Sequence, residues 1–198
     1  MNENKLDEWR KLSSERVGSY AIFDILCRRF ENVTKGKIGD FFMIDCNDWV
    51  QVVAEADDGR VVLVEQYRFG VENFSLEFPG GGMEPGEDPV EAAKRELEEE
   101  TGFCGESAEV ISKIYPNPAI QTNAMHVVLV KNCRRMRDTN FDEFEDLSTS
   151  LLTRRELLDA IATGKIYHCI AIAAVMKYVL LGSRSREFEN IWSNPQAT

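Results

Sequence analysis

The chain has 198 residues, of which 43% are hydrophobic and 29% are charged, and its formal net charge is −11. This composition describes an ordinary soluble protein, long enough for one domain with a full core or one domain with a short extension. The negative charge argues against broad electrostatic binding of nucleic acid. Any phosphate ligand must therefore be held by local Arg or Lys side chains or by a metal ion.

The termini and the cysteines predict a cytoplasmic protein. Residues 1–15 are polar and lack the apolar segment of a signal peptide, and the apolar stretch 170–181 is interrupted by Lys177 and too short to span a bilayer. Five scattered cysteines without a C-x-x-C pair predict reduced, mostly buried thiols. We expect structural roles for them and for both histidines, with no membrane partner. These residues are Cys27, Cys46, Cys104, Cys133, Cys169, His126 and His168.

Strands are predicted wherever β-branched and aromatic residues concentrate between turn residues. In the first half of the chain, the sequence Asp57-Asp58-Gly59 separates two such segments and predicts a hairpin. The last of these segments leads directly into the glycines at 80–82. The strands predicted in this half cover residues 17–30, 37–46, 49–56, 60–67 and 75–78.

A helix is predicted immediately after the glycines, over residues 89–101. Asp88 is the expected N-cap, and Pro89 suits the first helical position. Glu91 stands three residues after the cap and is expected to complete a capping box, while Gly102 is expected to end the helix.

The second half of the chain predicts three strands and then two helices. Thr153 is the expected N-cap of the first of these helices, with Glu156 completing a capping box and Gly164 as the stop. The order of elements along the whole chain predicts an α+β domain whose sheet carries helices on its faces. The predicted strands are 108–115, 124–131 and 147–152, and the helices are 154–163 and 170–181.

Three carboxylates lie on one side of the helix predicted at 89–101. Glu96, Glu99 and Glu100 are spaced i, i+3 and i+4, where like charges destabilise a helix by roughly 0.2–0.5 kcal/mol per pair. A solvated acidic face would also give this pattern, but such a helix would interleave lysines among the acids. Because a glycine-rich backbone precedes the helix, the cluster instead indicates oxygen ligands for Mg²⁺ or Mn²⁺.

The window from Gly81 to Phe103 resembles a known family motif. Its spacing, G-x5-E-x7-R-E-U-x-E-E-x-G-U with U a bulky apolar residue, matches the Nudix box at every fixed position. The resemblance implies an α/β/α sandwich around a mixed β-sheet. We expect a Nudix domain over 46–185, a β-rich N-terminal extension over 1–45 and a tail over 186–198.

Other segments resemble one branch of that family. Residues 64–68 (VEQYR), 76–81 (LEFPGG) and the N-terminal extension are similar to ADP-ribose pyrophosphatases, which hydrolyse nucleoside diphosphate sugars. Members of that branch are commonly homodimers that exchange N-terminal strands, so the resemblance implies a homodimer. An intrachain sheet explains the strand-rich stretch 17–46 equally well.

The resemblance also implies roles for site residues. The metal ligands are expected to be the Gly80 carbonyl, Glu96, Glu99 and Glu100, holding Mg²⁺ with Mn²⁺ as a substitute; Glu99 is also counted as catalytic. Arg68 is expected to bind phosphate. A general base is expected on the acidic loop 142–146, with Glu143 as the base and Glu145 as an additional metal ligand, although a shift of one or two residues would exchange these roles.

The substrate class depends on residues beyond the box. Tyr115 and Pro118 are the expected substrate-binding residues, because enzymes that cleave ADP-ribose often carry a Pro at this distance after the box. The usual Ser-Pro-Gly turn is replaced by Asn117-Pro118-Ala119, and the Glu that follows it in that branch is absent. ADP-ribose is the favoured substrate, but these departures open the pocket to other sugars, with GDP-mannose or another ADP-sugar as the next choice.

Two other functions remain open at this stage. One is a Nudix hydrolase of nucleoside triphosphates or dinucleoside polyphosphates. The other is a domain without catalysis that senses a ligand, although such domains usually lose box residues and all of them are present here.

Overall fold

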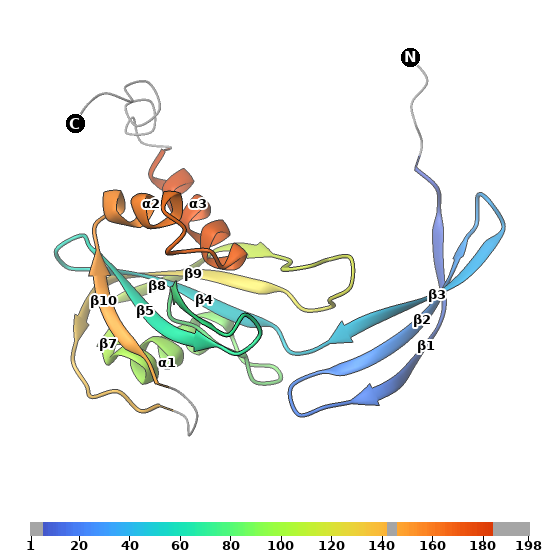
Figure 1. Cartoon of the computed structure of the whole chain (residues 1–198), viewed down its shortest axis with the longest axis horizontal. Coiled ribbons are helices and arrows are strands. Elements are labelled where there is room, and N and C mark those ends of the chain that lie inside the picture. The colour runs from blue at the N-terminus through green and yellow to red at the C-terminus, as the bar shows by residue number, and fades with distance from the viewer. Residues whose placement is uncertain (1–5, 142–145, 184–198) are drawn as a thin grey trace, which may run out of the picture. The chain divides into compact units, whose positions relative to one another are not determined.

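A computed structural model describes residues 6–141 and 146–183 of the chain (Figure 1). The chain divides into two compact units. The first comprises Met1–Asn47 and Tyr115–Asn123, and the second comprises Asp48–Ile114 and Ala124–Thr198.

The first unit is built on an antiparallel three-stranded sheet. Its strands are β1 (Trp9–Ser19), β2 (Asp24–Asn32) and β3 (Lys37–Asp45), in the order β1-β2-β3. The single strand predicted over 17–30 is therefore wrong, since a turn divides it. In that turn the Tyr20 N–H donates to the Phe23 carbonyl at 2.9 Å, and the two rings pack with centroids 5.1 Å apart. Aromatic residues typical of a strand thus stabilise a turn here.

The segment 115–123 completes this unit by pairing with the end of β3. The Ile44 N–H donates to the Ile120 carbonyl at 2.7 Å, and the Thr122 N–H donates to the Ile44 carbonyl at 3.1 Å. None of the apolar side chains that the structure describes in this unit is fully buried. The sheet therefore carries an unusual amount of apolar surface.

The second unit contains a mixed seven-stranded sheet with the path β10-β5-β4-β9-β7, to which β6 is added beside β5 and β8 beside β9. Strands β4 and β9 are parallel, and the other pairs are antiparallel. The strands are β4 (Trp49–Ala56), β5 (Val61–Arg68), β6 (Asn73–Glu77), β7 (Phe103–Cys104), β8 (Ser107–Ile114), β9 (Met125–Arg135) and β10 (Ser148–Leu152).

Helices cover both faces of this sheet. Helix α1 (Pro89–Thr101) lies on one face, while α2 (Arg154–Ala162) and α3 (Cys169–Ser183) lie on the other (Figure 1). Side chains alternate between the faces along each strand. Val52 of β4 packs in the core under α1, and Val53 packs in the core under α2 and α3. The predicted α+β fold with a mixed sheet is confirmed.

The helix ends largely follow the sequence. Asp88 caps α1 by accepting from the Val90 and Glu91 N–H groups, and Gly102 ends it in the left-handed region at φ 71°. The second half of the predicted capping box is absent, because Glu91 pairs with Lys94 instead. The capping box of α2, from Thr153 and Glu156, is present in full.

The remaining differences are local. Strand β7 was not predicted, because two residues between a helix stop and a turn carry no recognisable pattern. The expectation that most cysteines are buried is wrong, since Cys133 alone is buried and Cys169 is exposed. Among the described residues, no helix combines the length and the apolar character needed to cross a membrane.

Candidate active site

Strand β4 fixes the glycine-rich loop that precedes α1. The Val52 N–H donates to the Pro79 carbonyl at 2.8 Å, and the Val50 N–H donates to the Gly81 carbonyl at 2.9 Å. A Cβ on Gly80 would lie 2.2 Å from the Val50 carbonyl oxygen, so only glycine allows this close approach. The loop is therefore held as an added edge beside the sheet.

The same loop contacts the carboxylates of α1. The Gly80 N–H donates to Glu100 Oε2 at 2.9 Å, and a Cβ on Gly81 would lie 2.6 Å from Glu96 Oε1. Glu96 and Glu100 are 9% and 3% exposed, whereas the Glu99 side chain is 40% exposed. Two buried carboxylates and a glycine backbone thus lie in direct proximity.

Arg95 connects the acidic groups of the helix and the loop. Its guanidinium donates to Glu87 at 3.1 Å, to Glu96 at 2.8 Å and to Glu99 at 3.2 Å, and also to the Gly82 carbonyl at 3.1 Å. The hydrogen bond to Glu87 is the main cause of the raised pKa of Arg95, and the same bond lowers the pKa of Glu87. Arg95 therefore compensates charge that would otherwise repel across one helix face.

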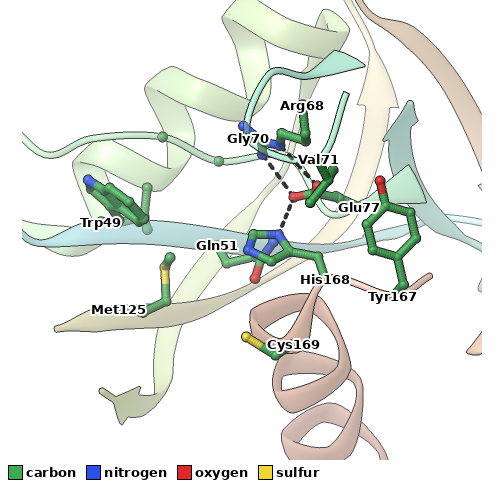
Figure 2. A pocket seen from close by; sticks show the side chains of 13 residues that line it. Trp49, Gln51, Arg68, Gly70, Val71, Glu77, Met125, Tyr167, His168 and Cys169 are labelled. Atoms are coloured by element: carbon green, nitrogen blue, oxygen red, sulfur yellow. Dashed lines mark hydrogen bonds and ion pairs between the residues drawn. The ribbon is translucent and has the colours of Figure 1, made fainter. Parts of the chain in front are cut away.

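A cavity of about 560 Å³ opens beside the glycine loop (Figure 2). Arg68, Glu77 and His168 form its polar wall, while Trp49, Val71 and Met125 supply apolar surface. Gly80 and Gly81 also line it, so the cavity borders the loop that contacts the α1 carboxylates.

Glu77 organises the polar wall. Its carboxylate accepts two bonds from Arg68, Nε at 3.0 Å and Nη2 at 2.8 Å, and contacts His168 Nδ1 at 2.6 Å. Burial at 1% exposure would by itself raise the pKa of Glu77, but the bonds from His168 and Arg68 outweigh it and lower the pKa to about 2. Glu77 is thus ionised and accepts only.

The structure brings together some of the residues predicted from the sequence. Arg68 and Gly80 line this cavity, and Glu96 and Glu100 contact the adjacent loop. Glu99 lies on the same helix face, bonded to Arg95.

The other predicted residues lie elsewhere. Tyr115 and Pro118 belong to the first unit, where they line a cavity of about 520 Å³ together with Arg28 and Phe30. Glu143 and Glu145 lie outside the described residues.

Sequence reasoning missed several residues of the cavity wall. His168 and Cys169 were expected to be purely structural, and Gln51 and Glu77 stand within predicted strands and were given no role. The available indication was a polar residue in a buried apolar strand, as Gln51 is between Val50 and Val52. Such a residue must find a hydrogen-bond partner.

The donor atoms around Gly80 fit a hard divalent cation in kind. Carboxylate and backbone carbonyl oxygens are the ligands that Mg²⁺ prefers, and the close approach of Gly81 to Glu96 concentrates such oxygens. In the described part of the chain, no group of three or more His, Cys, Asp or Glu side chains is arranged to hold a metal ion. Arg95 bonds to both Glu96 and Glu99, and these ion pairs are part of the reason that the carboxylates do not converge on one point.

Comparison with known proteins defines the class. The NUDIX domain model matches residues 49–171, more than half of the chain, and covers the loop, helix α1 and the cavity wall. The chain therefore belongs to the Nudix family and is an enzyme of the Nudix hydrolase class.

Individual relatives carry narrower descriptions. The chain is 27% identical over 161 residues to the ADP-ribose pyrophosphatase of Bacillus subtilis (strain 168), covering 81% of this chain and 86% of the relative. It is 37% identical over 142 residues to the ADP-sugar pyrophosphatase of Mus musculus, covering 65% and 63%. A crystal structure of an ADP compounds hydrolase superposes with a TM-score of 0.80 at 23% identity, covering 91% and 97%, which supports the fold alone.

The ionised state of Glu77 predicts a pH dependence of stability. Because its pKa falls from 4.5 to about 2 on folding, the ionised carboxylate stabilises the fold above pH 4.5. This contribution, roughly 3 kcal/mol, is lost as the pH falls toward the folded pKa. Urea unfolding of the wild type and Glu77→Gln should differ most near neutral pH, and the difference should shrink by about half or more near pH 3.

The control is Glu91→Gln, at an exposed position of α1. It should show no comparable change in the same series. A wild-type advantage over Glu77→Gln that stays constant down to about pH 3 would contradict this account of Glu77.

Proposed function

We propose that the protein hydrolyses the diphosphate bond of a nucleoside diphosphate sugar, with ADP-ribose favoured and GDP-mannose or another ADP-sugar next. The observation that carries the proposal is the contact between the glycine loop and the buried carboxylates Glu96 and Glu100, at the edge of a cavity whose wall contains Arg68. A site with clustered acids beside a basic wall suits a cation together with an anionic ligand.

Glu96, Glu99, Glu100 and the Gly80 carbonyl are the proposed ligands of Mg²⁺, with Mn²⁺ as a substitute. When bound, the cation neutralises diphosphate charge and acidifies a water molecule. The hydrogen bond from the Gly80 N–H to Glu100 orients that carboxylate and links it to the loop. Arg95 holds Glu96 and Glu99 on the same face of α1, which keeps ligands positioned before substrate arrives.

The protein's own residues supply binding and proton transfer. Arg68 binds a phosphate oxygen by charge-assisted hydrogen bonding, while Glu77 fixes the guanidinium plane through two bonds. Water attacks one phosphorus, the anhydride P–O bond breaks, and two monophosphates leave. By resemblance, Glu143 accepts the proton of that water and Glu145 assists at the metal, or the two exchange roles.

Two relatives support this substrate class, since one is named an ADP-ribose pyrophosphatase and the other an ADP-sugar pyrophosphatase. Tyr115 and Pro118 are retained as substrate-binding residues. Hydrolysis of nucleoside triphosphates or dinucleoside polyphosphates is the alternative activity, and the substrate assay below distinguishes it from the proposed one. A ligand-sensing domain without catalysis is disfavoured because the box carboxylates are buried against the loop rather than lost.

We also propose that the enzyme is a homodimer formed through the N-terminal extension. The first unit exposes several large apolar side chains, among them Trp9 at 55%, Ile38 at 63% and Phe42 at 61%. Apolar surface of this kind on a thin sheet marks a protein interface, and a second copy of the chain is the partner that the resemblance implies.

Loss of a proposed ligand should abolish turnover without unfolding the protein. Glu100→Gln keeps an oxygen that accepts from the Gly80 N–H but removes the charge, so kcat/KM for ADP-ribose should fall on the order of 100-fold or more. The control Glu91→Gln on the same helix should retain activity and thermal stability. Chelation of divalent cations should stop the wild-type reaction, and addition of Mg²⁺ should restore it.

A parallel assay of ADP-ribose, GDP-mannose, a nucleoside triphosphate and a dinucleoside polyphosphate tests the substrate class. Highest kcat/KM on a nucleotide sugar supports the proposal. Preference for the triphosphate or the dinucleotide contradicts it. Full activity of Glu100→Gln would contradict the role of Glu100.

Sedimentation equilibrium tests the dimer. The mass should be about 45 kDa, twice that of the 22.5 kDa chain. Phe42→Asp should shift the protein toward monomer, whereas Phe69→Asp, at an exposed aromatic position outside the first unit, should not. A monomeric wild type at micromolar concentration would contradict the proposal.

A further inference from the structure

Gln51 is a buried side chain with an unsatisfied atom at the cavity wall. It is 4% exposed, lines the cavity, and its Oε1 makes no hydrogen bond to any residue that the structure describes. Buried polar atoms are bonded in the great majority of cases, and leaving one unsatisfied costs stability. Gln51 therefore indicates a ligand that completes its hydrogen bonding.

The place of Gln51 in β4 explains why it faces the cavity. Side chains alternate along the strand, and Val53, two residues on, packs in the core under α3. Gln51 is on that same side, where α3 begins at Cys169 and the cavity opens. A Cβ on Gly80 would lie 3.0 Å from Gln51 Cα. The backbone of Gln51 is therefore in contact with the glycine loop.

His168 adds a second polar group to the same wall. Because the ionised Glu77 carboxylate can only accept, His168 Nδ1 carries the hydrogen of their 2.6 Å bond. This bond fixes the ring, and no second hydrogen bond of the imidazole to a described residue is present. Figure 2 shows the bond from the ring to Glu77, and His168, Glu77 and Gln51 all line the cavity.

We propose that Gln51 and His168 form a subsite for the hydroxyl groups of a sugar attached directly to the diphosphate. This inference rests on the proposed function. A hydroxyl both donates and accepts, so it satisfies the Gln51 amide in either orientation and also the free imidazole nitrogen. Trp49 and Met125 provide apolar surface for the carbon face of the ring.

The position of the subsite favours a sugar over a nucleobase. Gln51 borders Gly80, and Gly80 contacts the carboxylate proposed to act at the diphosphate. A sugar joined directly to the diphosphate can reach Gln51 while the diphosphate lies beside the Gly80 loop. A nucleobase is separated from the diphosphate by a ribose. The two sugars of the substrate share this chemistry, so the test must distinguish them.

The test is calorimetric titration in EDTA, which prevents turnover, with three ligands. These are ADP-ribose, the methyl ester of ADP, which lacks the second sugar, and ADP-ribose with a 2′,3′-dideoxy nucleoside sugar. In the wild type, one of the two analogues should bind about tenfold or more weakly than ADP-ribose, because it lacks the hydroxyl groups that the subsite binds. In Gln51→Leu the same truncation should change affinity less than about twofold, because the group that reads the hydroxyl is gone.

The variants keep the test decisive. His168→Ala should lose the same discrimination, while Gln66→Leu, a glutamine of β5 that does not line the cavity, should keep it. Melting temperatures confirm folding. The truncation that loses its effect identifies which sugar occupies the subsite.

Three outcomes overturn the inference: no measurable binding of ADP-ribose, equal binding of all three ligands to the wild type, or discrimination that persists in Gln51→Leu. A parallel turnover assay with Mg²⁺ separates the two proposals. If Gln51→Leu loses the discrimination but the wild type does not hydrolyse ADP-ribose, the subsite is supported and the proposed reaction is contradicted.

Discussion

Carboxylates on one face of α1 repel one another, and Arg95 of the same helix offsets that repulsion by bonding to Glu96 and Glu99. The same guanidinium reaches the Gly82 carbonyl and Glu87, so it also ties the helix to the loop before it. Glu87 in turn accepts from the Glu84 N–H and holds the turn into α1. The half-buried guanidinium of Arg95 therefore joins the helix, the loop and the acidic face.

Strand β4 connects these elements to the cavity lined by Arg68, Glu77 and His168. Its N–H groups at Val50 and Val52 hold the glycine loop, while its opposite-facing side chain at Gln51 reaches the cavity wall. One strand thus sets the distance between the acids of α1 and the polar wall formed by Glu77 and His168. In the proposed function, hydrolysis of the diphosphate and recognition of the attached sugar would therefore depend on the same backbone hydrogen bonds of β4.

The ends of α1 and the shared face of its carboxylates could be predicted from the sequence. Asp88, Pro89 and Gly102 fix the ends of α1 through capping and backbone preference, and those ends set the common face of the carboxylates. The bonds of Glu77 could not be predicted from the sequence. Glu77 lies beside Arg68 because β5 pairs with β6, and His168, which also bonds to Glu77, comes from a distant part of the chain. The prediction of one strand over 17–30 was wrong because Tyr20 and Phe23 favour a strand by residue type, but here they pack against each other in a turn.

Metal binding itself tests the central claim, that the face held by Arg95 is a cation site. Titration of the full-length protein with Mn²⁺, followed by the electron paramagnetic resonance of the free ion, should show binding that Mg²⁺ displaces. Glu96→Gln should weaken it at least roughly tenfold, the loss seen when even a partner of a ligand is removed, while Glu91→Gln leaves it unchanged. Equal Mn²⁺ affinity in the wild type and Glu96→Gln would contradict the account.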